Sequence, residues 1–160
     1  MRQNEFFKSN KRDKGFMLYK TNHPFDCRTF PQAFFSIIGL FARDSHFHIQ
    51  NCWGHGGTLN ITTVCQGKCG HLYMHYNSVP DHRLIVSNIE FIHKRQGYMT
   101  ELFAILKEIR RSYHTGPIVI ESVLSDEMEA WCKKNGFVID PRNKGNYIWP
   151  PTAITVTREP

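Results

Sequence analysis

The sequence lacks any long hydrophobic run. No apolar stretch approaches the roughly 18 residues of a membrane-spanning helix, so we expect no helical membrane span. Residues 1–20 are basic and lack the apolar segment of a secretory signal, so we expect a cytoplasmic protein. Internal repeats and low-complexity tracts are also absent, which excludes a repeat architecture.

The sequence has fewer acidic than basic residues, 14 Asp/Glu against 20 Lys/Arg, and its formal net charge is +6. Residues 1–20 hold six Lys/Arg against two acidic residues and carry +4; the remainder, with 14 basic and 12 acidic residues, carries +2. The excess belongs mostly to one terminal segment, so by itself it does not indicate a nucleic-acid-binding protein. Because 160 residues suit one domain, we expect a basic arm over 1–20 and a single domain over 21–160.

The five cysteines are an odd number, which, without a secretory signal, favours free thiols in a reducing compartment. Three of them lie among seven of the nine histidines, between His46 and His93, and thiolates and imidazoles are the ligands that zinc prefers. The spacing Cys65-x3-Cys69-x-His71 nevertheless lacks the second cysteine pair of familiar zinc motifs. The alternative is that Cys65 and Cys69 flank a hairpin turn, and we expect no metal site.

Hydrophobic periodicity predicts an α+β domain with a mixed sheet. Helical spacing predicts helices over 31–43 and 98–113, and Ser125 is a suitable N-cap for a third helix that ends before Gly136. Strand patterns are found over 58–65, 71–76, 84–93, 117–124, 137–140 and 147–149, with connections at 54–57 and 141–145 and further candidate strands at 16–19 and 153–157. The strand–helix–strand order after residue 84 implies a right-handed crossover and one parallel strand pair.

The most informative segment is Ile89–Met99, where a strand ends, a basic turn follows and an amphipathic helix begins. Free N–H groups at a helix start, together with the helix dipole, form an anion site. Lys94 and Arg95 add positive charge, and Gly97 permits a tight turn. A pyrophosphate group would fit this turn. The alternative is that the turn only begins a helix.

The turn resembles that of the GCN5-related N-acetyltransferase superfamily, in which Gln/Arg-x-x-Gly-x-Gly/Ala follows the fourth strand and binds the coenzyme A pyrophosphate. Here the turn is Lys94-Arg95-Gln96-Gly97-Tyr98-Met99, and the Asn135-Gly136-Phe137 segment resembles a second family feature. The resemblance covers roughly residues 84–149. The turn after Ile-Glu-Phe is also similar to that of a small phage anti-CRISPR acetyltransferase. Within the turn, Met99 replaces Gly/Ala and Lys94 replaces Gln/Arg, and a further departure concerns the general acid, where Cys132 replaces a tyrosine.

The resemblance implies a mixed, mostly antiparallel sheet flanked by helices, and transfer of acetyl from acetyl-CoA to a primary amine, with a protein lysine as the first choice. It also implies a set of cofactor-binding residues on the turn and its surroundings. This set is Phe91, Ile92, His93, Lys94, Arg95, Gln96, Gly97, Tyr98, Met99, Thr100 and Ser125. The side chain of Met99 either points into the core or crowds the pyrophosphate.

Three residues are candidates for proton transfer. Glu90 occupies the place of a glutamate base in several family enzymes, and His93 is the second candidate base. Cys132 stands where many members have a tyrosine that acts as the general acid. A thiol has an ordinary pKa of about 8.5, so it could protonate the leaving thiolate. Each has a structural alternative: Glu90 faces solvent, His93 contacts solvent or phosphate, and Cys132 packs as a small buried residue beside Trp131.

Two other functions fit the same sequence. The fold could persist without acetyl transfer as a binding or inhibitory protein, which Met99 and Cys132 favour. Alternatively, residues 2–20 and the His/Cys region could direct a transferase to nucleic acid. The sequence leaves the acceptor and the oligomeric state open.

Overall fold

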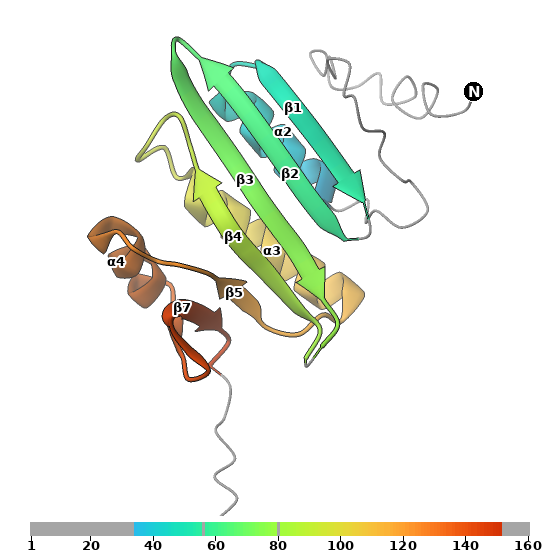
Figure 1. The fold of residues 1–160 in the computed structure, drawn as a ribbon, viewed down its shortest axis with the longest axis vertical. Coiled ribbons are helices and arrows are strands. Elements are labelled where there is room, and N and C mark those ends of the chain that lie inside the picture. The colour runs from blue at the N-terminus through green and yellow to red at the C-terminus, as the bar shows by residue number, and fades with distance from the viewer. Residues whose placement is uncertain (1–33, 56, 80, 152–160) are drawn as a thin grey trace, which may run out of the picture.

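The computed structural model describes residues 34–55, 57–79 and 81–151. These residues form one seven-stranded sheet in the order β1-β2-β3-β4-β5-β7-β6 (Figure 1). The strands are β1 Ile49–His55, β2 Thr58–Cys65, β3 Lys68–Asn77, β4 Arg83–Glu90, β5 Ile118–Ile120, β6 Val138–Asp140 and β7 Asn143–Trp149. All neighbours are antiparallel except β4 and β5. The predicted parallel pair is therefore confirmed.

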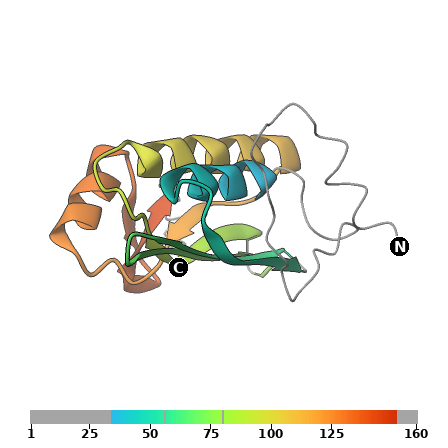
Figure 2. The ribbon, with the colours of Figure 1, turned by 90° about the horizontal axis from the view of Figure 1, so that it is seen from above.

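Three helices occur in the described part: α2 Phe34–Asp44, α3 Tyr98–Tyr113 and α4 Asp126–Lys134. Figure 2 shows α2 and α3 side by side on one face of the sheet, with α4 at the end that carries β7. The fold class predicted from the sequence, an α+β fold with a mixed, mostly antiparallel sheet flanked by helices, is confirmed. The arm over 1–20 and the candidate strands at 16–19 and 153–157 lie outside the described residues.

The core lies between these two helices and one face of the sheet. It includes the predicted apolar stripe of α3 at Leu102, Leu106 and Ile109, together with Phe34 and Phe41 of α2. Burial alternates strictly along β2, as expected when one strand face packs on a core. The other face of β1–β4 presents polar and aromatic side chains, and we call it the open face. Its members include Asn51, Trp53, Asn60, Thr62, His71, Tyr73, His75, Asn88 and Glu90.

The ends of two helices are as predicted because their signals are local. Helix α3 spans residues 98–113 as the apolar stripe indicates, and Gly97 adopts a left-handed φ of 80° at its N-cap. The Ser125 side chain caps α4 by accepting the Met128 N–H. The hairpin is also confirmed: Gln66 and Gly67 form its turn with φ values of 50° and 75°.

Several strand boundaries differ from the predictions. The loop predicted at 54–57 is wrong at Gly54 and His55, which end β1; that strand has few apolar side chains and was not predicted. Strand β7 begins at Asn143, inside the predicted connection. Strand β5 ends at Ile120, short of residue 124, because the next residues turn toward β7. Strand β4 ends at Glu90, because the N–H groups of Ile92 and His93 donate to the Asp44 carboxylate instead of to a neighbouring strand.

The His/Cys region lies on the first three strands. Within the described residues, no group of three or more His, Cys, Asp or Glu side chains is arranged to hold a metal ion. Cys52 and Cys65 are buried, Cys69 is exposed, and Cys65 Sγ lies 3.4 Å from His46 Nδ1. Cys65 and Cys69 do flank the hairpin turn.

A buried arginine joins the start of β4 to β6. Arg83 donates two hydrogen bonds to the Asp81 carboxylate, at 2.6 and 2.7 Å, and one to Asp140 at 3.4 Å. The side chains of Arg83 and Asp140 are only 10% and 3% exposed. The hydrogen bonds from Arg83 lower the pKa of Asp81, and the positive charges of Arg83 and Arg142 act in the same direction.

Acid should therefore weaken the fold through Asp81. Because its pKa is lower in the folded chain, the stabilisation is complete above the unfolded value, about 3.9, and is lost as pH falls through the folded value. We expect Asp81→Asn to lose less stability than the wild type between pH 6 and pH 2.5. Urea unfolding at both pH values measures this, with the exposed Asp126→Asn as the matched control. Equal acid losses in wild type and Asp81→Asn would contradict the prediction.

Candidate functional site

Strands β4 and β5 separate after a short paired segment. Leu84, Ile85 and Val86 of β4 pair with β5, and the last backbone hydrogen bond is donated by the Glu121 N–H to the Val86 carbonyl at 2.9 Å. Beyond this bond, β4 continues to Glu90, whereas the segment that follows β5 turns toward β7. There the Val123 N–H donates to the Gly145 carbonyl at 3.0 Å. We call the opening between residues 87–90 and 121–125 the fork (Figure 1).

A β-bulge at Ser87 changes which backbone groups face the fork. Tyr73 pairs with Asn88 and Met74 with Val86, so Ser87 is an extra residue in β4. The Val86 backbone faces β5. The Tyr76 N–H of β3 bonds toward β2, so by alternation the backbone groups of Tyr73 and His71 face β4, and those of their partners Asn88 and Glu90 face β3. Strand alternation then directs the backbone groups of Ile89 toward the fork. This part of β4 thus has backbone groups available to a bound molecule.

A carboxylate that the sequence analysis did not single out lies at the fork. Ser87 Oγ donates a 2.6 Å hydrogen bond to Glu121 Oε2. Glu121 directly follows the buried strand Ile118–Ile120. A charged residue after a fully apolar strand is the sequence signal that could have identified it.

The basic turn lies at the start of α3, as predicted. Residues 94–97 are exposed, and Arg95 and Gly97 have positive φ values of 62° and 80°. No side chain caps the helix, so the first-turn N–H groups have no side-chain acceptor. Arg95 Nη2 lies 3.8 Å from Glu127 Oε1, which brings the turn next to α4. The turn therefore combines helix N–H groups, Lys94 and Arg95, the donors that a phosphate group requires.

The aromatic and apolar residues around the turn pack into the protein. Phe91 stacks on Phe41 of α2, with centroids 4.7 Å apart, and on Tyr98, 5.5 Å away. Met99 is half-buried against the core, so its side chain takes the first of the two positions considered from the sequence. Thr100 lies 3.4 Å from Trp131 Nε1, linking the starts of α3 and α4. Gln96 is exposed.

His93 is held by Asp44, a buried carboxylate at the end of α2. Asp44 accepts hydrogen bonds from the amides of Ile92 and His93, at 2.6 and 2.9 Å. His93 Nδ1 lies 2.6 Å from the Asp44 carbonyl oxygen, which can only accept, so Nδ1 carries a proton. In the neutral ring, Nε2 is then the basic atom. These two amides are engaged by Asp44 rather than open to a cofactor.

Glu90 and Cys132 lie in contrasting environments. Glu90 is exposed on the open face, directly opposite His71 of β3. Cys132 is fully buried, and burial, with a smaller contribution from the negative charge of Glu129, raises its pKa to about 12. Such a thiol is a weaker acid than a free cysteine, and the packing alternative accounts for its position.

The site residues fall into separate groups. The turn, His93 and Asp44 lie together at the carboxyl end of β4, and Glu90 is on the open face nearby. Ser125 is exposed at the start of α4, where its hydroxyl already accepts the Met128 N–H. Cys132 lies in the core and not with the exposed residues of the turn.

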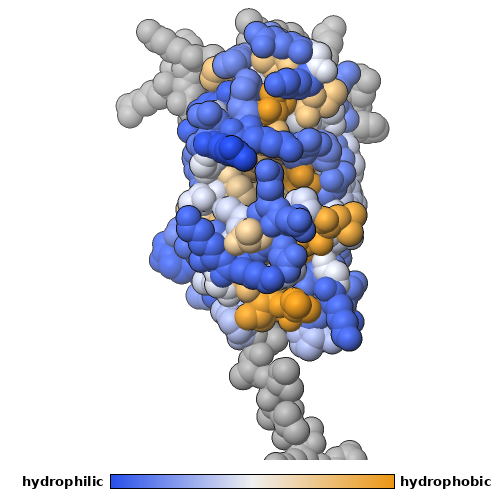
Figure 3. Space-filling model, turned by 90° about the vertical axis from the view of Figure 1, so that its left-hand side faces the viewer, coloured by the Kyte–Doolittle hydropathy of each residue, from blue (hydrophilic) through white to orange (hydrophobic). Residues whose placement is uncertain are grey.

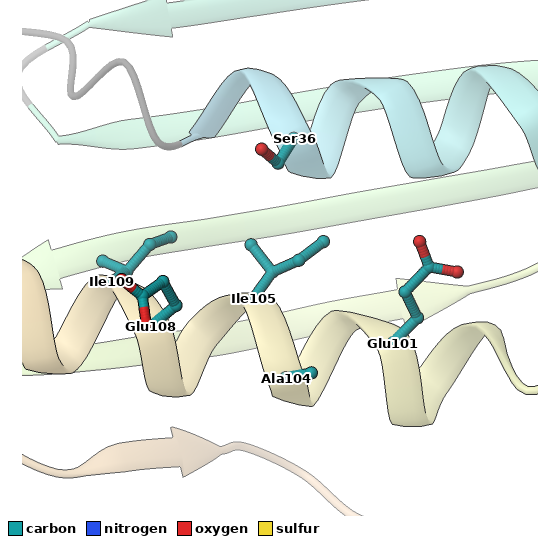
Figure 4. A pocket seen from close by; sticks show the side chains of 6 residues that line it. All are labelled: Ser36, Glu101, Ala104, Ile105, Glu108 and Ile109. Carbon is teal, nitrogen blue, oxygen red and sulfur yellow. The ribbon is translucent and has the colours of Figure 1, made fainter.

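The surface around the site is mostly polar. Figure 3 views the side on which α4 and the turn lie, and hydrophilic residues cover most of it, with separate hydrophobic patches. A groove of about 250 Å³ lies elsewhere, between α2 and α3, and is lined by Ser36, Glu101, Ala104, Ile105, Glu108 and Ile109 (Figure 4). Glu101 and Glu108 at its rim are paired with Arg43 and Arg111. No helix of the described residues is long and apolar enough to cross a membrane.

Comparisons with known proteins identify no family for this chain and include a weak structural similarity. No protein-family model matches the chain, and no curated protein matches it significantly. Among solved structures, the chain is similar to an acyl-CoA N-acyltransferase from Pseudomonas aeruginosa, with a TM-score of 0.38 and 11% identity. The match covers 57% of this chain and 65% of that one, less than two thirds of its length. At this level of similarity, the chain's own residues have to carry any proposal about function.

Proposed function

We propose that this chain is an acyl-CoA-dependent N-acyltransferase that uses acetyl-CoA and a primary amine, with a protein lysine as the first choice of acceptor. One observation carries the proposal: the fork in the sheet opens beside an uncapped helix start that bears Lys94 and Arg95. A long donor with a diphosphate at one end and a reactive group at the other matches this arrangement. The side chain of Met99 packs against the core, which leaves the turn clear for a diphosphate.

The chain's residues fit such a donor in two places. Lys94, Arg95 and the N–H groups at the start of α3 would hold the diphosphate. The backbone N–H of Ile89, on the side of β4 that faces the fork, and that of Phe91, just beyond β4, would orient the acyl carbonyl by hydrogen bonding. Bound acetyl-CoA supplies a thioester, which an amine can attack directly.

The acceptor amine has to lose a proton, because an ammonium group has no free electron pair. Glu90 and His93 remain the two sequence-based candidates for the base. His93 has a fixed ring and a basic Nε2, whereas Glu90 is the more accessible. Since Cys132 is buried and its pKa is about 12, water rather than this thiol would protonate the leaving thiolate.

Acetyl-CoA should bind through the turn. We expect calorimetric titration to detect binding to the full chain, and Lys94→Ala/Arg95→Ala to weaken it about tenfold or more, because hydrogen bonds to charged groups contribute about 1.5–3 kcal/mol each. Lys134→Ala/Lys144→Ala, which removes two exposed cations elsewhere, is the matched control and should bind as the wild type does. No heat at high micromolar ligand would refute the enzyme proposal.

A second candidate is a binding or inhibitory protein that keeps the fold without transfer. The buried position of Cys132 favours it, because this residue stands where the resemblance implies an acid. Intact mass of poly-lysine or of candidate proteins after incubation with acetyl-CoA separates the two functions. An added acetyl group supports transfer, whereas donor binding without any acetylation supports the second candidate.

A further inference from the structure

The open face holds a histidine that the proposed chemistry has not used. His71 of β3 lies directly opposite Glu90 of β4. Paired residues on one sheet face have Cβ atoms about 4.5–5.5 Å apart, so the imidazole and the carboxylate are neighbours. Both belong to the part of the sheet where β4 has separated from β5.

Asn88 fixes the protonation pattern of His71. His71 Nε2 lies 2.7 Å from the side-chain oxygen Oδ1 of Asn88. An amide oxygen can only accept a hydrogen bond, so Nε2 carries the proton. In the neutral ring, Nδ1 then holds the lone pair, and no hydrogen bond to Nδ1 occurs within the described residues. This is the arrangement of a base whose second nitrogen is oriented by a partner.

Few other titratable side chains lie near His71 on the open face. The titratable side chains closest to it in the described residues are Glu90 across the strand pair, and Cys69 and Tyr73 two residues away on β3. Strand β2 contributes Thr62, which does not titrate. A carboxylate beside a neutral imidazole attracts an ammonium group and provides an atom that can take its proton.

We propose that His71 is the proton acceptor for the attacking amine, with Asn88 as its positioning residue and Glu90 as the group that draws in the ammonium; this rests on the proposed function. An N–H bond of the ammonium breaks and an N–H bond forms at Nδ1. The freed electron pair forms the bond to the acyl carbon, the carbon–sulfur bond breaks, and the nitrogen gives a second proton to water, which leaves a neutral amide. The sulfur leaves as a thiolate and takes a proton from water, and the imidazolium returns its proton to solvent.

The test is the pH dependence of poly-lysine acetylation by the full chain with acetyl-CoA. We expect His71→Gln to lower kcat about 100-fold or more and to remove the acidic limb of the pH profile. Asn88→Ala should shift that limb and lower kcat by a smaller factor. His75→Gln, which changes the next imidazole on the same strand face, lies opposite Ile85 and should keep the wild-type profile.

The outcomes separate this proposal from the donor site. If His71→Gln keeps the acidic limb, or if His93→Gln removes it instead, the role of His71 is refuted. Acetyl-CoA binding without any acetylation of poly-lysine also refutes it but leaves the donor site intact. Absence of acetyl-CoA binding refutes the proposed function itself. Nitrogen-15 spectra of the imidazoles add a direct check: a His71 ring protonated at Nδ1 instead of Nε2 would overturn the proposal.

Discussion

Replacing Asp44 by alanine is expected to destabilise the fold by about 3–5 kcal/mol, because it removes a buried charged acceptor. The carboxylate accepts the N–H groups of Ile92 and His93, at 2.6 and 2.9 Å, and Asp44 is fully buried. Alanine would leave both donors without this acceptor, and the Ile92 N–H is buried away from water. Asp44→Asn keeps one acceptor oxygen and should lose less.

Urea unfolding of Asp44→Ala measures this loss, with Asp126→Ala as the control because Asp126 is exposed at the start of α4. We also expect weaker acetyl-CoA binding, since Asp44 fixes the chain that leads into the basic turn. A loss of stability below 1 kcal/mol would contradict the role of Asp44 as the buried acceptor for the Ile92 and His93 N–H groups. Equal losses in the two variants would do the same.

The second large effect is expected at Gly116. A Cβ atom at this position would lie 1.7 Å from the carbonyl oxygen of Asp81, and that atom belongs to backbone. Gly116 N–H also donates to the His82 carbonyl at 2.8 Å, so the two segments cannot separate without losing this bond. Gly116→Ala should therefore displace the start of β4 and destabilise the chain by about 4 kcal/mol or more.

A glycine with free space around it provides the matched control. Gly39 lies within α2, and a Cβ built there has no atom within 4 Å apart from its chain neighbours and the backbone of its own helix. Gly39→Ala should stabilise the chain by about 1 kcal/mol through helix propensity. Thermal and urea unfolding of both variants make the comparison. Similar stability for the two variants would refute the steric explanation.

The sequence predicted the elements whose signals are local. The stripe from Leu102 to Ile109 and the cap at Ser125 are short-range patterns, and α3 and α4 begin where these patterns predict. The basic turn was also identified from neighbouring residues. The chemical roles assigned to Glu90 and His93 stay predictions, because no bound molecule tests them.

The contacts that position the candidate site could not be predicted in the same way. Asp44 binds amides 48 and 49 residues away, and no periodicity links them. The His71–Asn88 pair depends on the register of β3 and β4, and a one-residue shift would move His71 to the other face. The bulge at Ser87 also has no signal that a single sequence displays.

The short pairing of β4 with β5 has a consequence for how the chain folds. Strands β1 to β4 are joined in sequence order, and β6 and β7 form a tight hairpin, so these pairs close short loops. Two pairs instead close long loops for only three residue pairs each: β4–β5 joins Val86 to Ile120 across α3, and β5–β7 joins Ile120 to Tyr147 across α4. Because chain entropy penalises such closure before contacts compensate for it, we expect the two pairings that place β5 in the sheet to form after the hairpins.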